Sequence, residues 1–96
     1  MPTFIVLGKF TQEGVTKIKE SPQRLAAARK VVKSVGGEIK QFYYTMGRYD
    51  FVAITESPSN EAAMQALMTI GSVGAVRTET LTAILDEKAA DIIKKS

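Results

Sequence analysis

The sequence predicts a small α+β domain in which two helices pack on one four-stranded antiparallel sheet. Two observations lead to this prediction. Four short segments rich in β-branched and aromatic residues alternate with two segments whose apolar residues recur every three or four positions. In addition, 96 residues suffice for a single domain, and no linker or low-complexity stretch divides them.

The expected elements follow from where the apolar patterns begin and end. The first strand is a nearly unbroken apolar run, which is typical of a buried strand. In the first long helix, Leu25 and Val32 lie on the inward face, and in the second we expect Met64 and Met68 to fill the core. We therefore expect strands over residues 3–10, 38–46, 49–55 and 75–85, helices over 21–35, 60–70 and 86–96, and a short helical turn ending near Lys19.

Serine, proline and glycine residues set the expected boundaries. Ser21 is predicted to cap the free N–H groups of the first long helix, and Pro22 fits its first turn because proline has no N–H to leave unpaired. Gly36 is expected to end that helix in a left-handed cap. Gly47 and Arg48 suit a two-residue hairpin turn of type II′, in which glycine stands first.

The order of these elements is β-α-β-β-α-β followed by a helical extension, which is the ferredoxin-like arrangement. Right-handed crossovers place the first and third strands in the middle of the four-stranded antiparallel sheet. We expect one domain over residues 1–85 and an amphipathic helical tail over residues 86–96.

Two helices can cover only one face of such a sheet, yet neither face is polar enough to lie comfortably in water. Pairing through the predicted turn places Tyr44 opposite Phe51 on an aromatic face, and Tyr43 opposite Val52 on a mixed face that also holds Asp50. Burial of several hundred Å² of such surface recovers several kcal/mol at about 25 cal/mol per Å². We therefore predict a homo-oligomer assembled through the open sheet face. The alternative is that the C-terminal helix folds back over that face.

The composition excludes several chemistries. The chain contains no cysteine and no histidine, so disulfides, thiolate nucleophiles and serine–histidine–aspartate triads are absent. No carboxylate cluster has the spacing of metal ligands, and we expect neither a metal nor a cofactor. The net charge of +3 comes from scattered basic residues, without the focused stripe that nucleic-acid binding favours. No apolar run approaches the roughly 20 residues that span a bilayer, so we expect no membrane partner and a cytoplasmic location.

Several motifs resemble those of the GYD domain family over about residues 2–85. The name-giving residues stand as Gly47, Tyr49 and Asp50, with one arginine inserted after the glycine, and residues 71–80 resemble the closing motif of the family. The resemblance implies an assembly of the dimeric α/β-barrel type and no assigned biochemical function. Related members of that superfamily include ligand-sensing regulatory domains and cofactor-independent monooxygenases, a likeness of fold that does not fix a function.

Tyr49 and Asp50 form the first candidate site. As catalytic groups they could move a proton, with Asp50 acting as a base or holding a ligand donor. Alternatively, Tyr49 packs against its neighbours, and Asp50 accepts hydrogen bonds from nearby backbone or hydroxyl groups.

Four further residues are candidates for binding. Arg77 and Glu79 share one face of the last strand, where Arg77 could clamp a ligand carboxylate or form an ion pair with Glu79 or another subunit. Lys9 could join either polar group, or its long stem could carry the ammonium to water. Tyr43 combines an apolar ring with a polar hydroxyl, which suits an interface.

The sequence is compatible with three functions. The first is a non-catalytic oligomeric module that binds a small metabolite or a protein partner in the cleft between sheet and helices. The second is a cofactor-independent monooxygenase- or isomerase-like enzyme, in which Asp50 or Tyr49 handles a proton and Arg77 holds charge. An enclosed cavity of about 300 Å³ or more, with Asp50 and Arg77 converging on it, would favour the enzyme, whereas an open, wet cleft would favour the module. The third, a purely structural subunit, would have no pocket.

Overall fold

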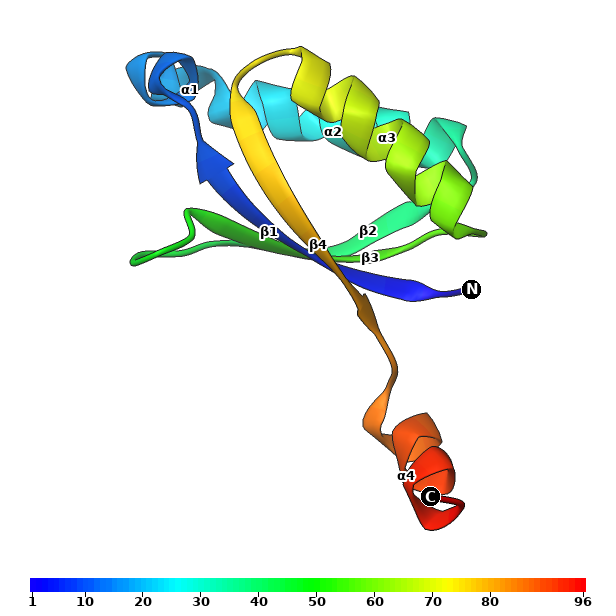
Figure 1. Ribbon diagram of the computed structural model, residues 1–96. Coiled ribbons are helices and arrows are strands. Elements are labelled where there is room, and N and C mark those ends of the chain that lie inside the picture. Colours follow the sequence, from blue (N-terminus) through cyan, green and yellow to red (C-terminus); the bar gives the residue numbers. More distant parts are fainter.

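The computed structural model describes residues 1–96. Figure 1 shows a twisted sheet with two long helices on one side and a short helix on the other. The elements in chain order are β1 (Thr3–Phe10), α1 (Gln12–Thr16), the 3₁₀ turn η1 (Ile18–Glu20), α2 (Ser21–Ser34), β2 (Glu38–Tyr44), β3 (Phe51–Glu56), α3 (Asn60–Ser72), β4 (Val76–Ala83) and α4 (Asp86–Lys94). The predicted α+β class and the ferredoxin-like order are confirmed.

The four strands form one antiparallel sheet in the order β2-β3-β1-β4, with the first and third strands at the centre as predicted. β1 pairs with β4 along its full length, from Thr3 opposite Ala83 to Phe10 opposite Val76. A bulge interrupts β2 between its second and fourth residues, which the sequence pattern did not indicate.

The hairpin between β2 and β3 keeps the predicted register but has a longer loop. Tyr44 lies opposite Phe51, as expected. The prediction of a two-residue turn is wrong, because β2 ends at Tyr44, β3 begins only at Phe51, and residues 45–50 form the loop. The Thr45 N–H donates to the Asp50 carbonyl (2.8 Å), while the Asp50 N–H donates to the Gly8 carbonyl of β1 (2.8 Å). The backbone at Asp50 is therefore drawn toward β1.

Ser21 does not cap α2, contrary to prediction. The turn η1 leads directly into α2, so Glu20 occupies the cap position and makes no side-chain cap bond. The Ser21 side chain is instead buried, and its Oγ lies 3.0 Å from the Tyr44 hydroxyl on β2. The glycine that was expected to end this helix, Gly36, does adopt a positive φ of 87°.

The core lies between the sheet and the layer formed by α2 and α3. Phe42 and Phe51 stack there with ring centroids 5.1 Å apart. The centre of the core consists of five buried residues, Val6, Val32, Ile39, Ala53 and Ala66. The aromatic face of the hairpin thus meets the helices, and the mixed face is the open one.

Met64 and Met68 lie on the outside of α3, so the prediction that they fill the core is wrong. Met68 is 67% exposed, whereas Ala66 is only 3% exposed. The side of α3 that faces the sheet is therefore built from small residues, and the larger methionines border a shallow depression next to β4.

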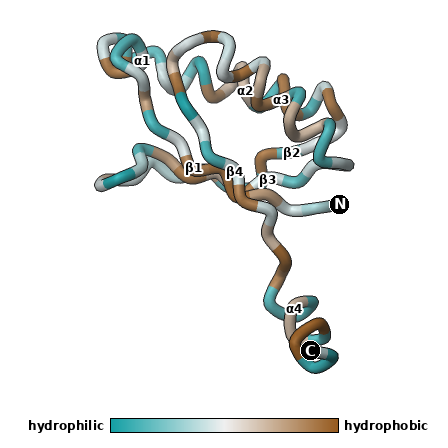
Figure 2. Tube along the Cα trace, viewed as in Figure 1, coloured by the Kyte–Doolittle hydropathy of each residue, from teal (hydrophilic) through white to brown (hydrophobic).

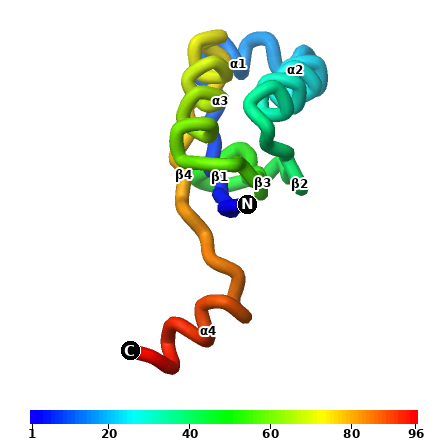
Figure 3. The backbone as a smooth tube through the Cα atoms, turned by 90° about the vertical axis from the view of Figure 1, so that its right-hand side faces the viewer, coloured from blue at the N-terminus to red at the C-terminus, as the bar shows by residue number.

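The sheet face opposite α2 and α3 is uncovered in the single chain, and we call it the open face. Figure 3 shows α4 on this side of the sheet but well away from it. In Figure 2, apolar segments lie along the strands and again on α4. By strand alternation and register, the open face consists of Ile5, Leu7, Lys9, Gln41, Tyr43, Val52, Ile54, Glu56, Arg77, Glu79 and Leu81. None of the helices is both long enough and apolar enough to cross a membrane.

Candidate functional site

An apolar cleft lies between α2, α3 and the inner face of the sheet. Its volume is about 220 Å³, somewhat below the roughly 300–1,000 Å³ of typical ligand pockets, so it suits a molecule of few heavy atoms. Its floor comes from the sheet and its walls from the facing sides of the two helices. The main lining residues are Phe4, Val6, Phe42, Phe51 and Ala53 from the strands, Leu25, Ala28, Val31 and Val32 from α2, and Ala63, Ala66, Leu67 and Ile70 from α3.

The cleft exists because the two helices face each other with small side chains. Ala27 and Ala28 line it from α2, and Ala63 and Ala66 line it from α3. Alanine has only a methyl group, so at the distance that separates α2 and α3 these four side chains leave space above the sheet unfilled. In agreement with this, no large side chain in the chain is completely buried.

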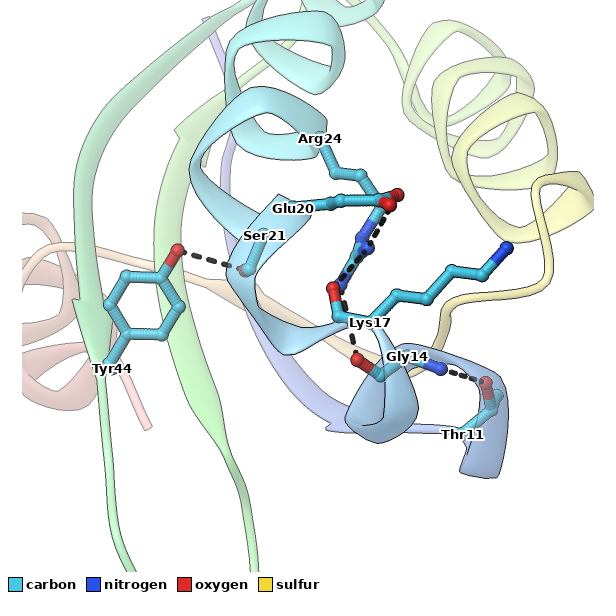
Figure 4. A network of polar contacts seen from close by, with 7 residues as sticks. All are labelled: Thr11, Gly14, Lys17, Glu20, Ser21, Arg24 and Tyr44. Atoms are coloured by element: carbon cyan, nitrogen blue, oxygen red, sulfur yellow. Dashed lines mark hydrogen bonds and ion pairs between the residues drawn. The ribbon is translucent and has the colours of Figure 1, made fainter.

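One end of the cleft carries polar groups centred on Arg24 of α2 (Figure 4). The Arg24 guanidinium donates to the Lys17 carbonyl (3.0 Å) and the Gly14 carbonyl (3.3 Å), at the C-terminal end of α1. The Lys17 carbonyl also accepts from the Glu20 N–H (2.9 Å), so Arg24 adds a second donor to it and links the start of α2 to the end of α1. Glu20 lies 3.8 Å from the same guanidinium, in an exposed pair of little energetic weight. The cleft thus has a mainly apolar lining with scattered serine and threonine hydroxyls, and Arg24 is its one charged lining residue.

A second cluster lies on the open face and contains four of the predicted site residues. Lys9 and Arg77 are direct neighbours across the β1–β4 pairing. The Tyr49 hydroxyl donates to the Glu79 carboxylate (3.1 Å), and the Lys9 Nζ lies 5.6 Å from the centroid of the Tyr49 ring. The ion pair considered between Arg77 and Glu79 is not formed in the single chain, whose ion pairs lie elsewhere. This cluster is exposed and shallow.

Asp50 lies next to this cluster but engages the backbone. Its carboxylate Oδ2 accepts a hydrogen bond of 2.9 Å from the N–H of Phe10, the last residue of β1. β1 extends past the start of β3, so this N–H has no ladder partner on that side. The side chain of Asp50 therefore replaces a missing strand bond, and neither Asp50 nor Arg77 lines the cleft.

We expect Asp50→Ala to lower the free energy of unfolding by about 2 kcal/mol, because the half-buried N–H of Phe10 then loses a charged acceptor. Asp50→Asn should cost about half as much, since the amide oxygen can still accept the bond. Urea unfolding of the three proteins measures both effects. If Asp50 served a reaction and did not stabilise the fold, the opposite result is expected: Asp50→Ala would be as stable as the parent or more stable.

Tyr43, the remaining candidate, lies on the open face in a row that runs through Val52 and Leu7 to Glu79, so two strands separate it from Glu79 of the polar cluster. Sequence reasoning missed the residues at the polar end of the cleft. The only hint was that Ser21 and Arg24 lie three positions apart at the start of a helix, on the side that Leu25 also borders.

No group of three or more carboxylates lies close enough to hold a metal ion.

The family model of the GYD domain matches residues 4–93. The chain belongs to the GYD domain family. The match reaches into α4, beyond residue 85, where the sequence resemblance was expected to end. One relative, from Thermus thermophilus, is 32% identical over 96 residues, covering 99% of this GYD chain and 98% of the relative; it is named glutamine synthetase and cystathionine β-lyase binding protein.

Solved structures place this GYD chain among ferredoxin-like domains. A crystal structure of a Thermus thermophilus protein matches with a TM-score of 0.57 and 25% identity, covering 88% of this chain and 95% of that one. A feast or famine regulatory protein from M. tuberculosis, solved with L-methionine, matches with a TM-score of 0.67 at 16% identity. The aligned region is 88% of this chain and 51% of the regulator, and at that identity it establishes the fold alone. The named relative and these neighbours fit a binding or regulatory module.

Proposed function

We propose that this GYD-domain protein is a non-catalytic binding module that holds a small, mainly apolar molecule in the cleft between α2 and α3. The observation that carries the proposal is the cleft itself, about 220 Å³ in volume and lined mostly by hydrophobic side chains. A ligand with one polar or anionic end would place that end near Ser21 and Arg24. Most of the binding free energy would come from removing apolar surface from water.

The arrangement of the polar groups supports binding rather than catalysis. An enzyme of the kind considered would need Asp50, Tyr49 and Arg77 to converge on an enclosed site. These residues lie outside the cleft, which is lined by no carboxylate, lysine or tyrosine. Acid–base chemistry in the cleft would have to rely on serine and threonine hydroxyls, which are weak acids and weak bases without an activating partner.

The proposal includes assembly through the open face. Leu7 and Ile54 lie at the centre of this face, and no helix of the same chain covers it. The face combines an apolar centre with charged residues toward one end, and an exposed apolar patch bordered by polar residues is typical of an interaction site. A second copy of the chain, packed face to face, is the partner we propose.

A protein partner of a different kind is a second candidate, favoured by the name of the Thermus relative. That protein is described as binding glutamine synthetase and cystathionine β-lyase, and the present chain matches it over nearly its full length. We propose that a similar enzyme is a partner here. Surface plasmon resonance with glutamine synthetase from the same source tests this, and absence of binding at 100 µM, a binding free energy weaker than about −5.5 kcal/mol, would remove the candidate.

The cleft is tested with the dye 1-anilinonaphthalene-8-sulfonate, whose fluorescence rises in apolar sites and whose sulfonate suits the polar end of the cleft. We expect one dye per chain, and at least tenfold weaker binding by Ala28→Leu, because the added carbons occupy the cleft from α2. Ala26→Leu is the matched control, since Ala26 lies on the same helix, is exposed and does not line the cleft. Equal affinity of both variants, or no saturable site in the parent, would contradict the proposal.

A further inference from the structure

The C-terminal helix α4 has an apolar face that nothing in its own chain covers. Leu85, Ala89, Ile92 and Ile93 recur at steps of four, three and one residues, which places them on one side of the helix. Ile92 is 53% exposed and Ile93 is 69% exposed. An isolated helix of nine residues is only marginally stable in water, so α4 needs a surface to pack on.

The chain holds α4 away from its own sheet. The Cα radius of gyration is 14.4 Å, whereas a compact domain of this length has about 12.5 Å. The difference arises because β4 continues outward into α4 on the side of the open face (Figures 1 and 3). From residue 75 to residue 96 the sequence contains no glycine and no proline, the residues that most often reverse a chain. The backbone of Leu85, at the junction, is extended (φ −57°, ψ 142°).

The open face alone is smaller than a typical stable interface. Four strands about 4.8 Å apart and about seven residues long cover roughly 450–500 Å², whereas a stable dimer buries about 800 Å² per partner. A nine-residue helix about 10 Å wide presents roughly 135 Å² on one side. If each chain also buries one side of its own arm and an equal area beneath its partner's arm, the area buried per partner comes close to the area that a stable dimer buries.

We propose that α4, with Ile84 and Leu85, is an exchange arm: when two copies pack through their open faces, each arm packs its apolar side on the other copy. This rests on the proposed assembly through the open face and adds a second, separable contact to it. The occupant of the apolar side of α4 is therefore a second copy of this chain. The arm also explains why the exposed Ile84 and Leu85 lie beyond the end of the sheet.

The first test compares dimer dissociation constants by analytical ultracentrifugation. Ile93→Glu is expected to raise the dissociation constant about 10- to 100-fold, since each dimer loses two buried isoleucines. Lys94→Glu is the matched control: it introduces the same residue one position along, on the polar side of α4, and should change the constant less than threefold. If Ile93→Glu behaves like this control while the parent is a dimer, the arm is overturned and assembly through the open face stands. If the parent is a monomer, both fall.

The second test is amide hydrogen exchange of α4. In the dimer we expect residues 88–94 to exchange at least tenfold more slowly than in a monomeric variant carrying Leu7→Glu on the open face. Equal, fast exchange in both proteins would overturn the proposal, because the arm would then be free. Equal, slow exchange in both would also overturn it, because α4 would then be packed on its own chain.

Discussion

Substituting Gly8 by alanine is expected to lower the free energy of unfolding by about 3 kcal/mol, at the upper end of what a single added methyl group costs in a packed core. Gly8 lies in the middle of the central strand β1, opposite Phe51 on β3. A Cβ atom at Gly8 would lie within the Phe51 ring, in the space that its Cζ and Cε atoms occupy. The ring cannot move aside easily, because it is buried and stacks on Phe42 and packs against Phe10.

Urea unfolding followed by circular dichroism measures this effect. The midpoint should fall by about 1–3 M, given that the free energy of unfolding of a small domain falls by about 1–3 kcal/mol per molar urea. The double variant with Phe51→Leu should lose less than the sum of the two single effects, since the smaller side chain makes room for the methyl group. Gly71→Ala is the control: it lies in α3, where a Cβ meets nothing within 4 Å, and helix propensity predicts equal or slightly greater stability. If Gly8→Ala unfolds at the same urea concentration as the parent, the ring does not lie where the structure has it.

The second large effect is expected from Leu7→Glu, which places a carboxylate at the centre of the open face. In the proposed dimer, two such carboxylates would be removed from water, each directly opposite the carboxylate of Glu79, so the dissociation constant should rise at least 100-fold, about 2.7 kcal/mol. The monomer should remain folded, because Leu7 is only half-buried in the single chain. Light scattering at concentrations from 1 to 100 µM separates the two states.

Met68→Glu controls for the added charge. Met68 is an exposed apolar residue on the outer side of α3, across the molecule from the open face, so its substitution should leave the oligomer intact. A parent protein that is monomeric at 100 µM, or a Leu7→Glu variant that is as oligomeric as the parent, would show that the open face is not the contact between copies.

The features that depend on the alternation of side chains along strands could be predicted from the sequence. The register of Tyr44 with Phe51 follows from a turn near Gly47, and a strand period of two then assigns every hairpin side chain to a face. The central positions of β1 and β3 follow from the handedness of the crossovers. The proximity of Lys9 and Arg77 likewise follows from the pairing of the first and last strands alone.

The features that depend on distances between elements could not be predicted from the sequence. The acceptor for the Phe10 N–H is Asp50, 40 residues away, and no periodicity connects the two. The cleft depends on how far apart α2 and α3 lie, and alanines such as Ala28 and Ala66 are equally compatible with close helix contact. The residue type of Ser21 predicts a cap, but the preceding turn η1 runs directly into α2, so Ser21 is already inside the helix.

The bulge in β2 also decides how the sheet can grow. An edge strand with regular, unpaired backbone groups is a template for another chain, and irregular or charged edges discourage such pairing. On the β2 edge, the bulge between Ile39 and Gln41 breaks the regular spacing, and an ion pair of 3.5 Å between Lys40 and Glu38 lies beside it. β4, by contrast, is a regular edge of eight residues. Any continuation of the sheet from one molecule into the next would therefore begin at β4, which keeps the chain from polymerising through both edges at once.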